Sequence, residues 1–418
     1  MNVADSDEMG AHLKARGFQE VADLDSADAA LVNTCTVRDM AEHKASSYIG
    51  SLEEWKDANP SRLIIVAGCA VEHSKGKWEK RFPHVDLFVG AKEIDQFSAR
   101  LDEVLSSKQN MDALIPSEQS VSTLSPVSQG VTIMRGCNYN CSYCIVPSVR
   151  GRESYRPVPD ILSEVKRRVD AGAKEIWLLG QTVNSYKPSL PPRGGYDFSD
   201  LLRDVNAIPG LERIRFTSPH PYYMTERLIQ AMAESSRVCE AIHLPVQSGS
   251  SKILKAMKRS YTRDSFLASL RRLRELIPSI VISTDLIAGY PGETEDDFRE
   301  TMSLIEEADF DSAYCFGYSP RPGTASAQEA DDVPTHVKQD RLNALLDLTN
   351  KKGTEKARAL LHSVQEVLIE DDKGEGLFRG KTRGAWRARI KNQHLKCGQI
   401  VKVKITGTHS RELHGECV

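Results

Sequence analysis

Residues 131–152 read VTIMRGCNYNCSYCIVPSVRGR, a short apolar run that leads directly into a loop rich in cysteine. The run VTIMR predicts a buried strand, because a short apolar segment with β-branched residues suits a strand enclosed in a sheet. Cys137, Cys141 and Cys144 follow it with C-x3-C-x2-C spacing. Ligand sites in parallel α/β folds gather at the carboxyl ends of strands, so this loop is expected to carry one.

The same alternation of apolar strand and helical stretch continues along the chain after residue 131. Helices are expected between most of the strands, for example at 160–173 and 294–308. Six strand–helix units in succession are typical of an open or partial (β/α) barrel. The expected strands cover residues 131–135, 174–180, 212–217, 241–246, 280–289 and 311–319.

The N-terminal part shows a similar pattern on a smaller scale. Its apolar runs at 29–33, 62–68 and 85–90 predict buried strands, and residues 40–58 predict a helix between the first two. Alternating strands and helices favour a parallel α/β sheet. Residues 116–130, PSEQSVSTLSPVSQG, are rich in Ser, Pro and Gln and are expected to form a linker.

The C-terminal part is expected to form one long helix at 335–361 and then a small β-barrel of oligonucleotide-binding style. Residues 376–411 hold 10 Lys/Arg and no Asp or Glu. Such a block suggests contact with a polyanion, although composition alone slightly favours a solvated basic face. The short β runs that predict the barrel lie at 364–370, 376–383, 386–390, 399–407 and 412–418.

Composition places the chain among ordinary globular proteins. Its 418 residues are 40% hydrophobic and 27% charged, and no run of 18 apolar residues predicts a transmembrane helix. The start, MNVADSDEMGAH, lacks the basic and apolar regions of a signal peptide. We therefore expect a cytoplasmic, reducing location, where the nine cysteines are thiols or metal ligands rather than disulfides.

The three-cysteine loop does not suit a structural zinc site. Such sites take four ligands, whereas the next cysteine is Cys239 and the loop contains no histidine. Iron–sulfur clusters are held by cysteine thiolates. Three thiolates would leave one iron of a four-iron cluster open, and an open position suits the binding of a substrate or cofactor.

The loop resembles the cluster-binding motif of the radical S-adenosylmethionine superfamily, including the aromatic Tyr143 before its last cysteine. Further segments make the resemblance narrower, to the methylthiotransferases and within them to a branch that modifies tRNA. Those segments are GCNYNCSYCIVPSVRGRESYRP (136–157), LLGQTVNSY (178–186), HLPVQSGS (243–250), DLIAGYPGET (285–294) and YSPRPGT (318–324).

The resemblance covers essentially the whole chain and implies its division into domains. An N-terminal methylthiotransferase α/β domain is followed by a linker, a radical S-adenosylmethionine partial barrel and a β-barrel like the TRAM module. The expected boundaries are 1–115, 116–130, 131–358 and 359–418. The fold class is therefore α/β multidomain, with a small C-terminal β-barrel.

The resemblance also implies the cofactors. Cys137, Cys141 and Cys144 would hold a [4Fe-4S] cluster whose open iron binds S-adenosylmethionine, and reductive cleavage would yield a 5′-deoxyadenosyl radical. Loops at the barrel mouth would surround S-adenosylmethionine. For each of their residues, the alternative that it only shapes its loop stays open. These cofactor-binding candidates are Gln181, Asn184, Gln247, Ser248 and Gly289.

Cys35 and Cys69 each follow an N-terminal strand and could share a metal site, although two unrelated cysteines would be favoured in an isolated sequence. The resemblance implies a second four-iron cluster here, held by three cysteines, the first of them in a G-C-Q-M-N segment. This chain starts MNVADSD, so we expect it to lack the first strand and that thiolate. Either its start was assigned at an internal methionine or the chain is shorter.

Other single residues have plainer interpretations. His243 lies inside an apolar run and is expected to be a hydrogen-bonded core histidine. Cys239 and Cys315 lie in or beside apolar strands and are expected to act as small hydrophobic residues. Thr294 is placed to cap a helix.

The basic barrel resembles the module that grips tRNA in this branch. Lys and Arg would contact phosphates, and Trp386 and Phe378 would stack on bases. The target would be a purine of the anticodon loop, splayed into the barrel mouth. The proposed RNA-binding residues are Arg379, Lys381, Arg383, Trp386, Arg387 and Arg389.

The resulting hypothesis is an enzyme that adds a methylthio group to C2 of N6-isopentenyladenosine at position 37 of tRNA. It would act as a monomer, away from membranes, with an electron donor protein and a sulfur source. One alternative is a relative that modifies a ribosomal protein aspartate or threonylcarbamoyl-adenosine. The other is a nucleic-acid-binding protein that has lost sulfur insertion because the first N-terminal cysteine is absent.

Overall fold

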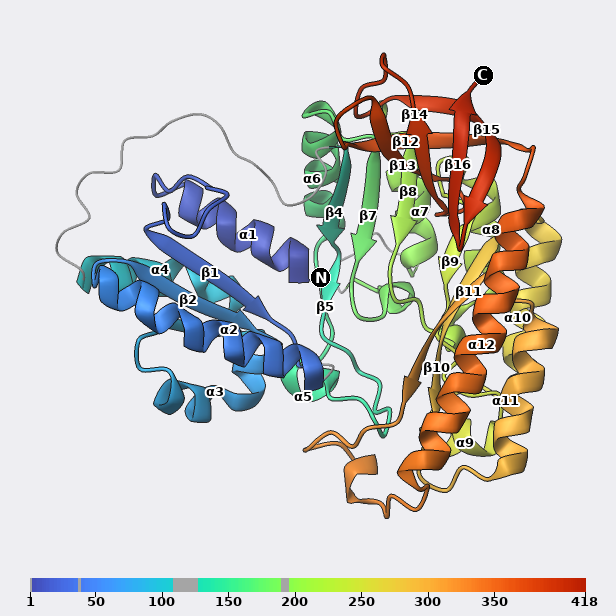
Figure 1. Ribbon diagram of the computed structural model, residues 1–418, viewed down its shortest axis with the longest axis horizontal. Coiled ribbons are helices and arrows are strands. Elements are labelled where there is room, and N and C mark those ends of the chain that lie inside the picture. The colour runs from blue at the N-terminus through green and yellow to red at the C-terminus, as the bar shows by residue number, and fades with distance from the viewer. Residues whose placement is uncertain (1, 37–38, 108–126, 189–194) are drawn as a thin grey trace. The chain divides into compact units, whose positions relative to one another are not determined.

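The computed structural model of the chain describes residues 2–36, 39–107, 127–188 and 195–418. These residues form two compact units (Figure 1). The first unit comprises the chain up to residue 124 together with segments 135–139 and 144–153. The second comprises 125–134, 140–143 and 154–418.

The first unit is built on a three-stranded parallel sheet. Strands β1 (Ala29–Thr34), β2 (Leu63–Gly68) and β3 (Leu87–Gly90) lie in that order, and every residue of β2 is buried. Alternate residues of β2 enter two separate apolar clusters, one on each face. The helices of this unit are α1 (Asn2–Lys14), α2 (Asp39–Ala58), α3 (Cys69–Arg81), η1 (Ile94–Gln96), α4 (Phe97–Ser107) and α5 (Val146–Arg150).

The second unit contains six parallel strands in two three-stranded sheets. One sheet has the order β4-β7-β8 and the other β11-β10-β9, and a bridge between Ile214 and Val238 links β8 to the segment before β9. Consecutive strands are thus neighbours, as in a partial (β/α) barrel. The strands are β4 (Ser128–Thr132), β7 (Glu175–Leu179), β8 (Arg213–Phe216), β9 (Ala241–His243), β10 (Val281–Ala288) and β11 (Ser312–Gly317).

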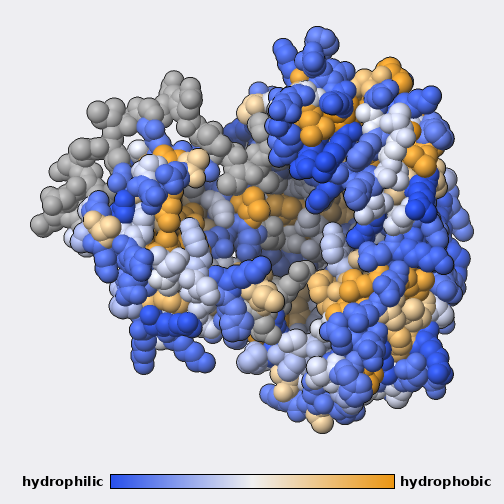
Figure 2. All heavy atoms as spheres, viewed as in Figure 1, coloured by the Kyte–Doolittle hydropathy of each residue, from blue (hydrophilic) through white to orange (hydrophobic). Residues whose placement is uncertain are grey.

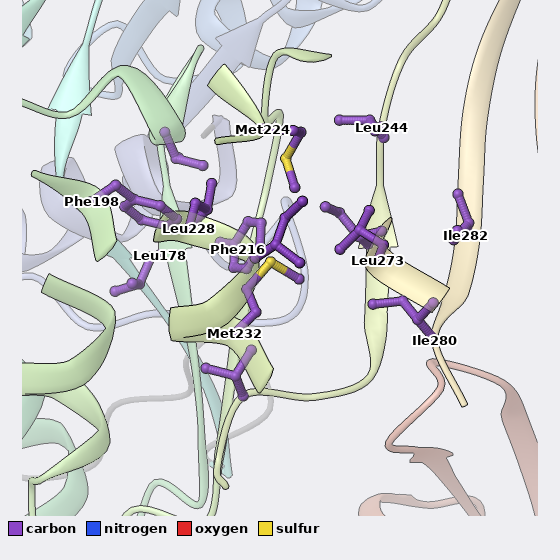
Figure 3. Close-up of a cluster of buried hydrophobic side chains, with 14 of the residues drawn as sticks. Leu178, Phe198, Phe216, Met224, Leu228, Met232, Leu244, Leu273, Ile280 and Ile282 are labelled. Atoms are coloured by element: carbon purple, nitrogen blue, oxygen red, sulfur yellow. The ribbon is translucent and has the colours of Figure 1, made fainter. Parts of the chain in front are cut away.

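Helices cover the outer side of these strands and bury the largest apolar cluster of the described residues. Figure 3 shows part of it, where Leu273 of a helix lies near Leu244 and Ile282. The helices are α6 (Val158–Asp170), η2 (Val183–Ser185), α7 (Phe198–Asn206), η3 (Pro221–Tyr223), α8 (Glu226–Glu234), α9 (Ser251–Ala256), α10 (Arg263–Leu276), α11 (Glu295–Ala308), η4 (Ser326–Gln328) and α12 (Thr335–Ala359). Two short strands, β5 (Met134–Arg135) and β6 (Ser154–Tyr155), flank the cysteine loop in the sequence.

The last part of the chain forms a closed five-stranded barrel with the order β12-β13-β14-β16-β15. Apolar residues such as Val367, Ile390 and Val403 fill its interior. Gly380 allows two strands to approach, since a Cβ there would lie 2.1 Å from the carbonyl oxygen of Leu368. The strands are β12 (Val364–Asp372), β13 (Leu377–Thr382), β14 (Arg387–Lys391), β15 (Ile400–His409) and β16 (Glu412–Cys417).

Two buried arginines of β8 fasten this barrel to the six-stranded part of the second unit. Arg213 Nη1 donates a hydrogen bond to the carbonyl of Lys381 (2.8 Å), and Arg215 Nη2 donates to that of Thr382 (2.7 Å). Arg215 also pairs with buried Glu175 (2.6 Å). The charge of Arg215 is thereby compensated inside the protein.

The α/β fold class predicted from the sequence is confirmed, with a parallel N-terminal sheet, a partial barrel and a small C-terminal β-barrel. Two details differ. Strand β4 begins at Ser128, inside the stretch expected to be linker, and residues 116–126 of that stretch lie outside the described residues. Cys69 begins helix α3 instead of lying in an irregular loop. Within the described ranges, no helix is long and apolar enough to cross a membrane.

Candidate functional site

The cysteine loop is closed at its base by backbone contacts within the first unit. The amide of Cys137 donates to the carbonyl of Gly151 (3.1 Å). Gly136 has a φ of 78°, and a Cβ there would lie 2.1 Å from the carbonyl oxygen of Arg152. Only glycine fits so close an approach without strain.

The middle of the loop is held by the second unit. The Ser142 hydroxyl donates to the carbonyl of Ala256 (2.9 Å) and lies 2.8 Å from the Tyr290 hydroxyl. The Ser142 amide donates to the carbonyl of Met257 (3.2 Å). These bonds fix the chain directly after Cys141.

Half-buried Arg259 lies beside Cys141. Its Nη1 donates to Cys141 Sγ (3.3 Å), while Nε donates to the Tyr261 hydroxyl (2.7 Å) and Nη2 to the carbonyl of Pro245 (3.1 Å). Burial alone would lower the pKa of Arg259, but nearby Tyr143, Tyr261 and Cys141 raise it above its ordinary value. The guanidinium therefore stays charged beside the Cys141 sulfur.

Cys69 has a comparable neighbour in the first unit. Arg150 Nε donates to Cys69 Sγ (3.1 Å), and its two terminal nitrogens donate to Asp5 Oδ2 (2.7 Å) and Asn2 Oδ1 (3.0 Å). Burial raises the pKa of the Cys69 thiol, and the Arg150 charge opposes that rise. Cys35 is close enough to affect the same pKa, so this unit brings two of the predicted ligands together.

No three His, Cys, Asp or Glu side chains in the described part of the chain converge closely enough to hold a metal ion. The donor chemistry of the cysteine loop nevertheless fits an iron–sulfur cluster. Its three thiols suit iron, and the charge of Arg259 beside Cys141 suits the negative charge of thiolate ligands. At the other site, Cys35 and Cys69 are both thiols, and Arg150 supplies the same compensation.

The predicted cofactor residues Gln181 and Asn184 differ in their surroundings. Asn184 is buried, and its amide both donates to the carbonyl of His220 (2.9 Å) and accepts from the amide of His220 (2.7 Å). It therefore organises the loop after β8. Gln181 Oε1 is buried and accepts no hydrogen bond from the described residues, so it is the better placed of the two to bind a ligand donor.

Gln247 and Ser248 form a constrained turn at the end of β9. Gln247 has a φ of 77°, its amide donates to the carbonyl of Asp285 (2.8 Å) and its carbonyl accepts from Ile287 (2.9 Å). Ser248 Oγ accepts from the amide of Ser250 (3.2 Å). The backbone of Gln247 is thereby fastened to β10.

Gly289 ends β10 with a φ of 73°. Its amide donates to Glu293 Oε2 (2.7 Å), and Glu293 pairs with Arg341 (2.8 Å). Burial raises the pKa of Glu293, and these two partners oppose the rise. Thr294, as predicted, caps α11 by accepting from the amide of Asp297.

The predicted RNA-binding residues lie in or beside the C-terminal barrel, and most have protein partners. Arg383 pairs with Glu240 (2.7 Å). The aromatic expectation does not fit the structure, because Trp386 and Phe378 are buried in the barrel core and offer no free ring face. Arg387 is exposed and Arg379 is half-buried, while Lys381 pairs with Glu370 (3.0 Å) and Arg389 with Glu412 (2.6 Å).

His243 is hydrogen-bonded, as expected, but it does not lie in the core. Its side chain is 30% exposed, with Nδ1 3.0 Å from Ser283 Oγ and Nε2 3.4 Å from Asp285 Oδ2. It lies on the face of the sheet opposite the core. Cys239 is buried and Cys315 half-buried, in keeping with their expected hydrophobic role.

The arginines beside the cysteines were missed by sequence reasoning. Arg150 lies in a quoted motif and Arg259 follows α9, but neither position carries a pattern that marks it as a sulfur neighbour. Their roles depend on contacts that are distant in sequence. Arg150 lies 81 positions from Cys69, and Arg259 lies 118 positions from Cys141.

Comparison with known proteins fits this arrangement. Residues 131–305 match the model of the radical SAM superfamily, and residues 1–90 match the uncharacterized protein family UPF0004. The tRNA-2-methylthio-N(6)-dimethylallyladenosine synthase of Clostridium botulinum (strain Loch Maree / Type A3) is 41% identical over 427 residues, covering 100% of this chain and 94% of that protein. The chain belongs to this family. It is therefore an enzyme of the radical S-adenosylmethionine methylthiotransferase type.

A second relative agrees with that assignment, and a solved structure shares the fold. The family member from Caldicellulosiruptor saccharolyticus is 40% identical, covering 100% of this chain and 90% of its own. Among solved structures, the radical S-adenosylmethionine methyltransferase TsrM from Kitasatospora setae, bound to tryptophan and a SAM analogue, has a TM-score of 0.55 at 14% identity. That match covers 88% of this chain and 76% of TsrM and shows a shared fold.

Proposed function

We propose that this chain adds a methylthio group to C2 of N6-isopentenyladenosine at position 37 of tRNA. The observation that carries the proposal is the 41% identity to a tRNA-2-methylthio-N(6)-dimethylallyladenosine synthase across the whole chain. The three-cysteine loop and the basic C-terminal barrel support it independently, because one suits radical chemistry and the other suits a polyanion.

Cys137, Cys141 and Cys144 would hold a [4Fe-4S] cluster, with S-adenosylmethionine beside it. When bound, these groups supply a 5′-deoxyadenosyl radical. The chain's own residues prepare the place. Arg259 compensates the charge of the Cys141 thiolate, and Gln181 Oε1 is available to accept a hydrogen bond from a ligand.

The loops with Gln247, Ser248 and Gly289 would approach S-adenosylmethionine mainly with their backbones. Gln247 and Gly289 both have positive φ, and a Cβ at Gly249 would lie 2.5 Å from the carbonyl oxygen of Glu300. Such tight turns bring peptide groups close to a ligand. Asn184 would act by holding the loop at His220 in place.

Cys35 and Cys69 would ligate a second cluster that takes part in sulfur transfer. Their closeness and the Arg150 donor on Cys69 support this part of the proposal. An electron donor protein and a sulfur source would complete the reaction. The enzyme would work in the cytoplasm as a monomer.

The anticodon loop would be gripped by cationic side chains of the C-terminal barrel, which neutralise phosphates without reading sequence. Exposed Arg387 is the best placed, and Arg379, Lys381, Arg383 and Arg389 would strengthen the local positive charge. Loss of one phosphate contact is expected to lower the salt dependence of binding by about one unit of slope.

Expression of the chain in a bacterial strain that lacks the 2-methylthio modification tests this function. Mass spectrometry of digested tRNA should then detect 2-methylthio-N6-isopentenyladenosine, and Cys141→Ala should abolish it. If only a threonylcarbamoyl-adenosine product or a ribosomal protein product appeared, the substrate assignment would be wrong.

A further inference from the structure

The sheet β11-β10-β9 has two unlike faces. Residues paired across parallel strands point to the same side, and here Asp285 pairs with Tyr314 and Ser283 with His243. With Ile287 and Phe316, which are also paired, these residues form what we call the open face. Every member is half-buried or exposed, whereas the alternate residues of β10 are buried.

Helices account for the buried side of this sheet. Ile282 and Leu286 of β10 share an apolar cluster with Phe266 of α10, Leu304 of α11 and Leu345 of α12. In Figure 1 these three helices lie together beside β10 and β11. Figure 3 shows Ile282 within that cluster.

A half-exposed face is unusual for such a sheet, because parallel sheets normally have both faces packed. Tyr314 is 58% exposed in the middle of β11, where a core residue would be expected. In a barrel of parallel strands, a half-exposed inner surface is where a substrate can lie.

The polar residues of the open face hold one another in place. His243 lies between Ser283 Oγ (3.0 Å from Nδ1) and Asp285 Oδ2 (3.4 Å from Nε2). The Tyr314 ring meets the His243 ring edge-on, with centroids 5.6 Å apart and planes at 76°. Among the described residues, Asp285 Oδ1 accepts no hydrogen bond, so an acceptor and an aromatic ring are both offered to a ligand.

We propose that the open face binds the purine base that is modified, an inference that rests on the proposed function. Tyr314 stacks on the base, and Asp285 Oδ1 accepts a hydrogen bond from its exocyclic N–H. Ile287 and Phe316, one step nearer the carboxyl ends of the strands, contact an alkyl substituent on that nitrogen.

The chemistry of the face favours a neutral base over other parts of a nucleic acid. None of its six members is Lys or Arg, so it is unsuited to phosphate. An exposed aromatic ring on a strand suits base stacking, and a fixed carboxylate oxygen suits an N–H donor. The apolar pair Ile287 and Phe316 suits an alkylated base better than the unsubstituted adenine of S-adenosylmethionine.

Binding of a short hairpin RNA tests the assignment, with the full-length reconstituted protein and N6-isopentenyladenosine at the target position. Fluorescence anisotropy should show that Tyr314→Leu weakens binding roughly five- to a hundredfold, the usual range for loss of a stacked base. Tyr314→Phe should bind normally because the ring is kept. Tyr48→Leu, at another exposed tyrosine, on α2, is the matched control and should have no effect.

A second hairpin, whose base carries an additional N6-methyl group and therefore no N–H, tests the role of Asp285. The unchanged protein should prefer the base with the N–H. Asp285→Asn should lose most of that preference, because an amide accepts more weakly than a carboxylate. If Tyr314→Leu does not fold, the comparison of the two hairpins tests the proposed base-binding role of the open face by itself.

The purine on the open face could come from the tRNA base or from the adenine of S-adenosylmethionine. Measuring the binding of S-adenosylmethionine to the same variants distinguishes these two sources. The inference predicts that Tyr314→Leu leaves it unchanged. Weakened S-adenosylmethionine binding with normal RNA binding would overturn the assignment, as would folded Tyr314→Leu and Asp285→Asn variants that bind both hairpins like the unchanged protein. Absence of methylthiolated product from the unchanged protein would instead refute the proposed function.

Discussion

In the described part of the chain, an arginine donates a hydrogen bond to a cysteine sulfur at two places. Arg259 does so to Cys141 and Arg150 to Cys69. A guanidinium is always charged, and a hydrogen bond between charged groups is stronger than a neutral one. Both arginines are therefore suited to stabilising negative charge on thiolates.

Replacing Arg259 with methionine should make the reduction potential of the cluster at Cys137, Cys141 and Cys144 more negative. Loss of a donor and a positive charge disfavours the reduced, more negative cluster. A shift on the order of 60 mV corresponds to a tenfold change in a one-electron equilibrium. A redox titration followed by electron paramagnetic resonance measures it, in a Cys35→Ala/Cys69→Ala background that leaves one cluster.

Arg271→Met is the matched control, because Arg271 is 64% exposed on its side chain and lies on the outer surface. The cluster in the Arg271→Met variant should have the same reduction potential as the cluster in the parent protein with Cys35→Ala/Cys69→Ala. A folded, iron-loaded Arg259→Met variant with the parent's potential would contradict the role of Arg259.

His220 should make stability depend on pH. Burial, helped by the charge of Arg259, lowers its pKa to about 2, so the unfolded chain binds a proton near pH 6.5 that the folded chain does not. Its contribution to stability is complete above pH 6.5 and declines as pH falls from there towards 2. At pH 5 the loss is on the order of 2 kcal/mol, from about 1.4 kcal/mol per pH unit.

His220→Asn keeps an acceptor for the amide of Tyr222 and removes the titrating ring. Its melting temperature should change less between pH 7 and pH 5 than that of the unchanged protein. Parallel curves for the two proteins would show that His220 is not the group responsible.

The role of a single residue could be predicted from the sequence where its partners are close in sequence. It could not be predicted where the tertiary fold brings the partners together. Thr294 could be predicted as a helix cap because the cap and its acceptor role lie within one turn. Asn184 could be singled out but its partner could not, since His220 lies on a different loop 36 positions away. His243 was misplaced because an apolar run does not reveal which face of a strand packs against helices.

At the scale of elements, strand prediction succeeded because buried parallel strands are continuous apolar runs. Strand β2 is buried throughout and lies within the predicted run 62–68. Short strands of the C-terminal barrel were also anticipated, but not their order. Strand β14 pairs in parallel with β16, a neighbour it does not follow in sequence, and no local pattern encodes that pairing.

The close approach of β12 and β13 at Gly380 gives a test of that barrel. Gly380→Ala would place a Cβ 2.1 Å from the Leu368 carbonyl oxygen and should destabilise the protein by about 1–3 kcal/mol through overpacking. Gly407→Ala in β15 is the control, since its Cβ would meet nothing closer than 3.9 Å. Urea denaturation measures both, and equal stabilities would contradict the strand register described here.

At the scale of the molecule, the buried charged residue Arg215 joins the C-terminal barrel to the six-stranded part of the second unit. Arg215 and Glu175 are both almost fully buried, and Arg215 reaches carbonyls 167 and 168 positions away. This pairing is not visible in a sequence, because the acceptors for Arg215 are backbone carbonyls of a distant segment. Figure 2 shows that the visible face of the molecule is largely hydrophilic. Arg215 and Glu175 differ from these surface residues because they are charged and buried.

Arg215→Met should lower the free energy of unfolding by about 3–5 kcal/mol, because it leaves the Glu175 carboxylate buried without its cation. The double variant Arg215→Met/Glu175→Gln should recover part of that loss. Arg272→Met, which removes exposed ion pairs with Glu226 and Glu275, should cost much less, because solvent screens exposed pairs. Similar losses from Arg215→Met and Arg272→Met in urea denaturation would count against a structural role for the buried pair.

The most direct test is a reconstituted reaction with S-adenosylmethionine, a reductant, sulfide and an anticodon hairpin that carries N6-isopentenyladenosine. Mass spectrometry should find a methylthio group on the adenine ring with the unchanged chain, and none with Cys137→Ala, Cys141→Ala or Cys144→Ala. An iron-loaded, folded chain that cleaves S-adenosylmethionine but leaves the hairpin unmodified would contradict the account.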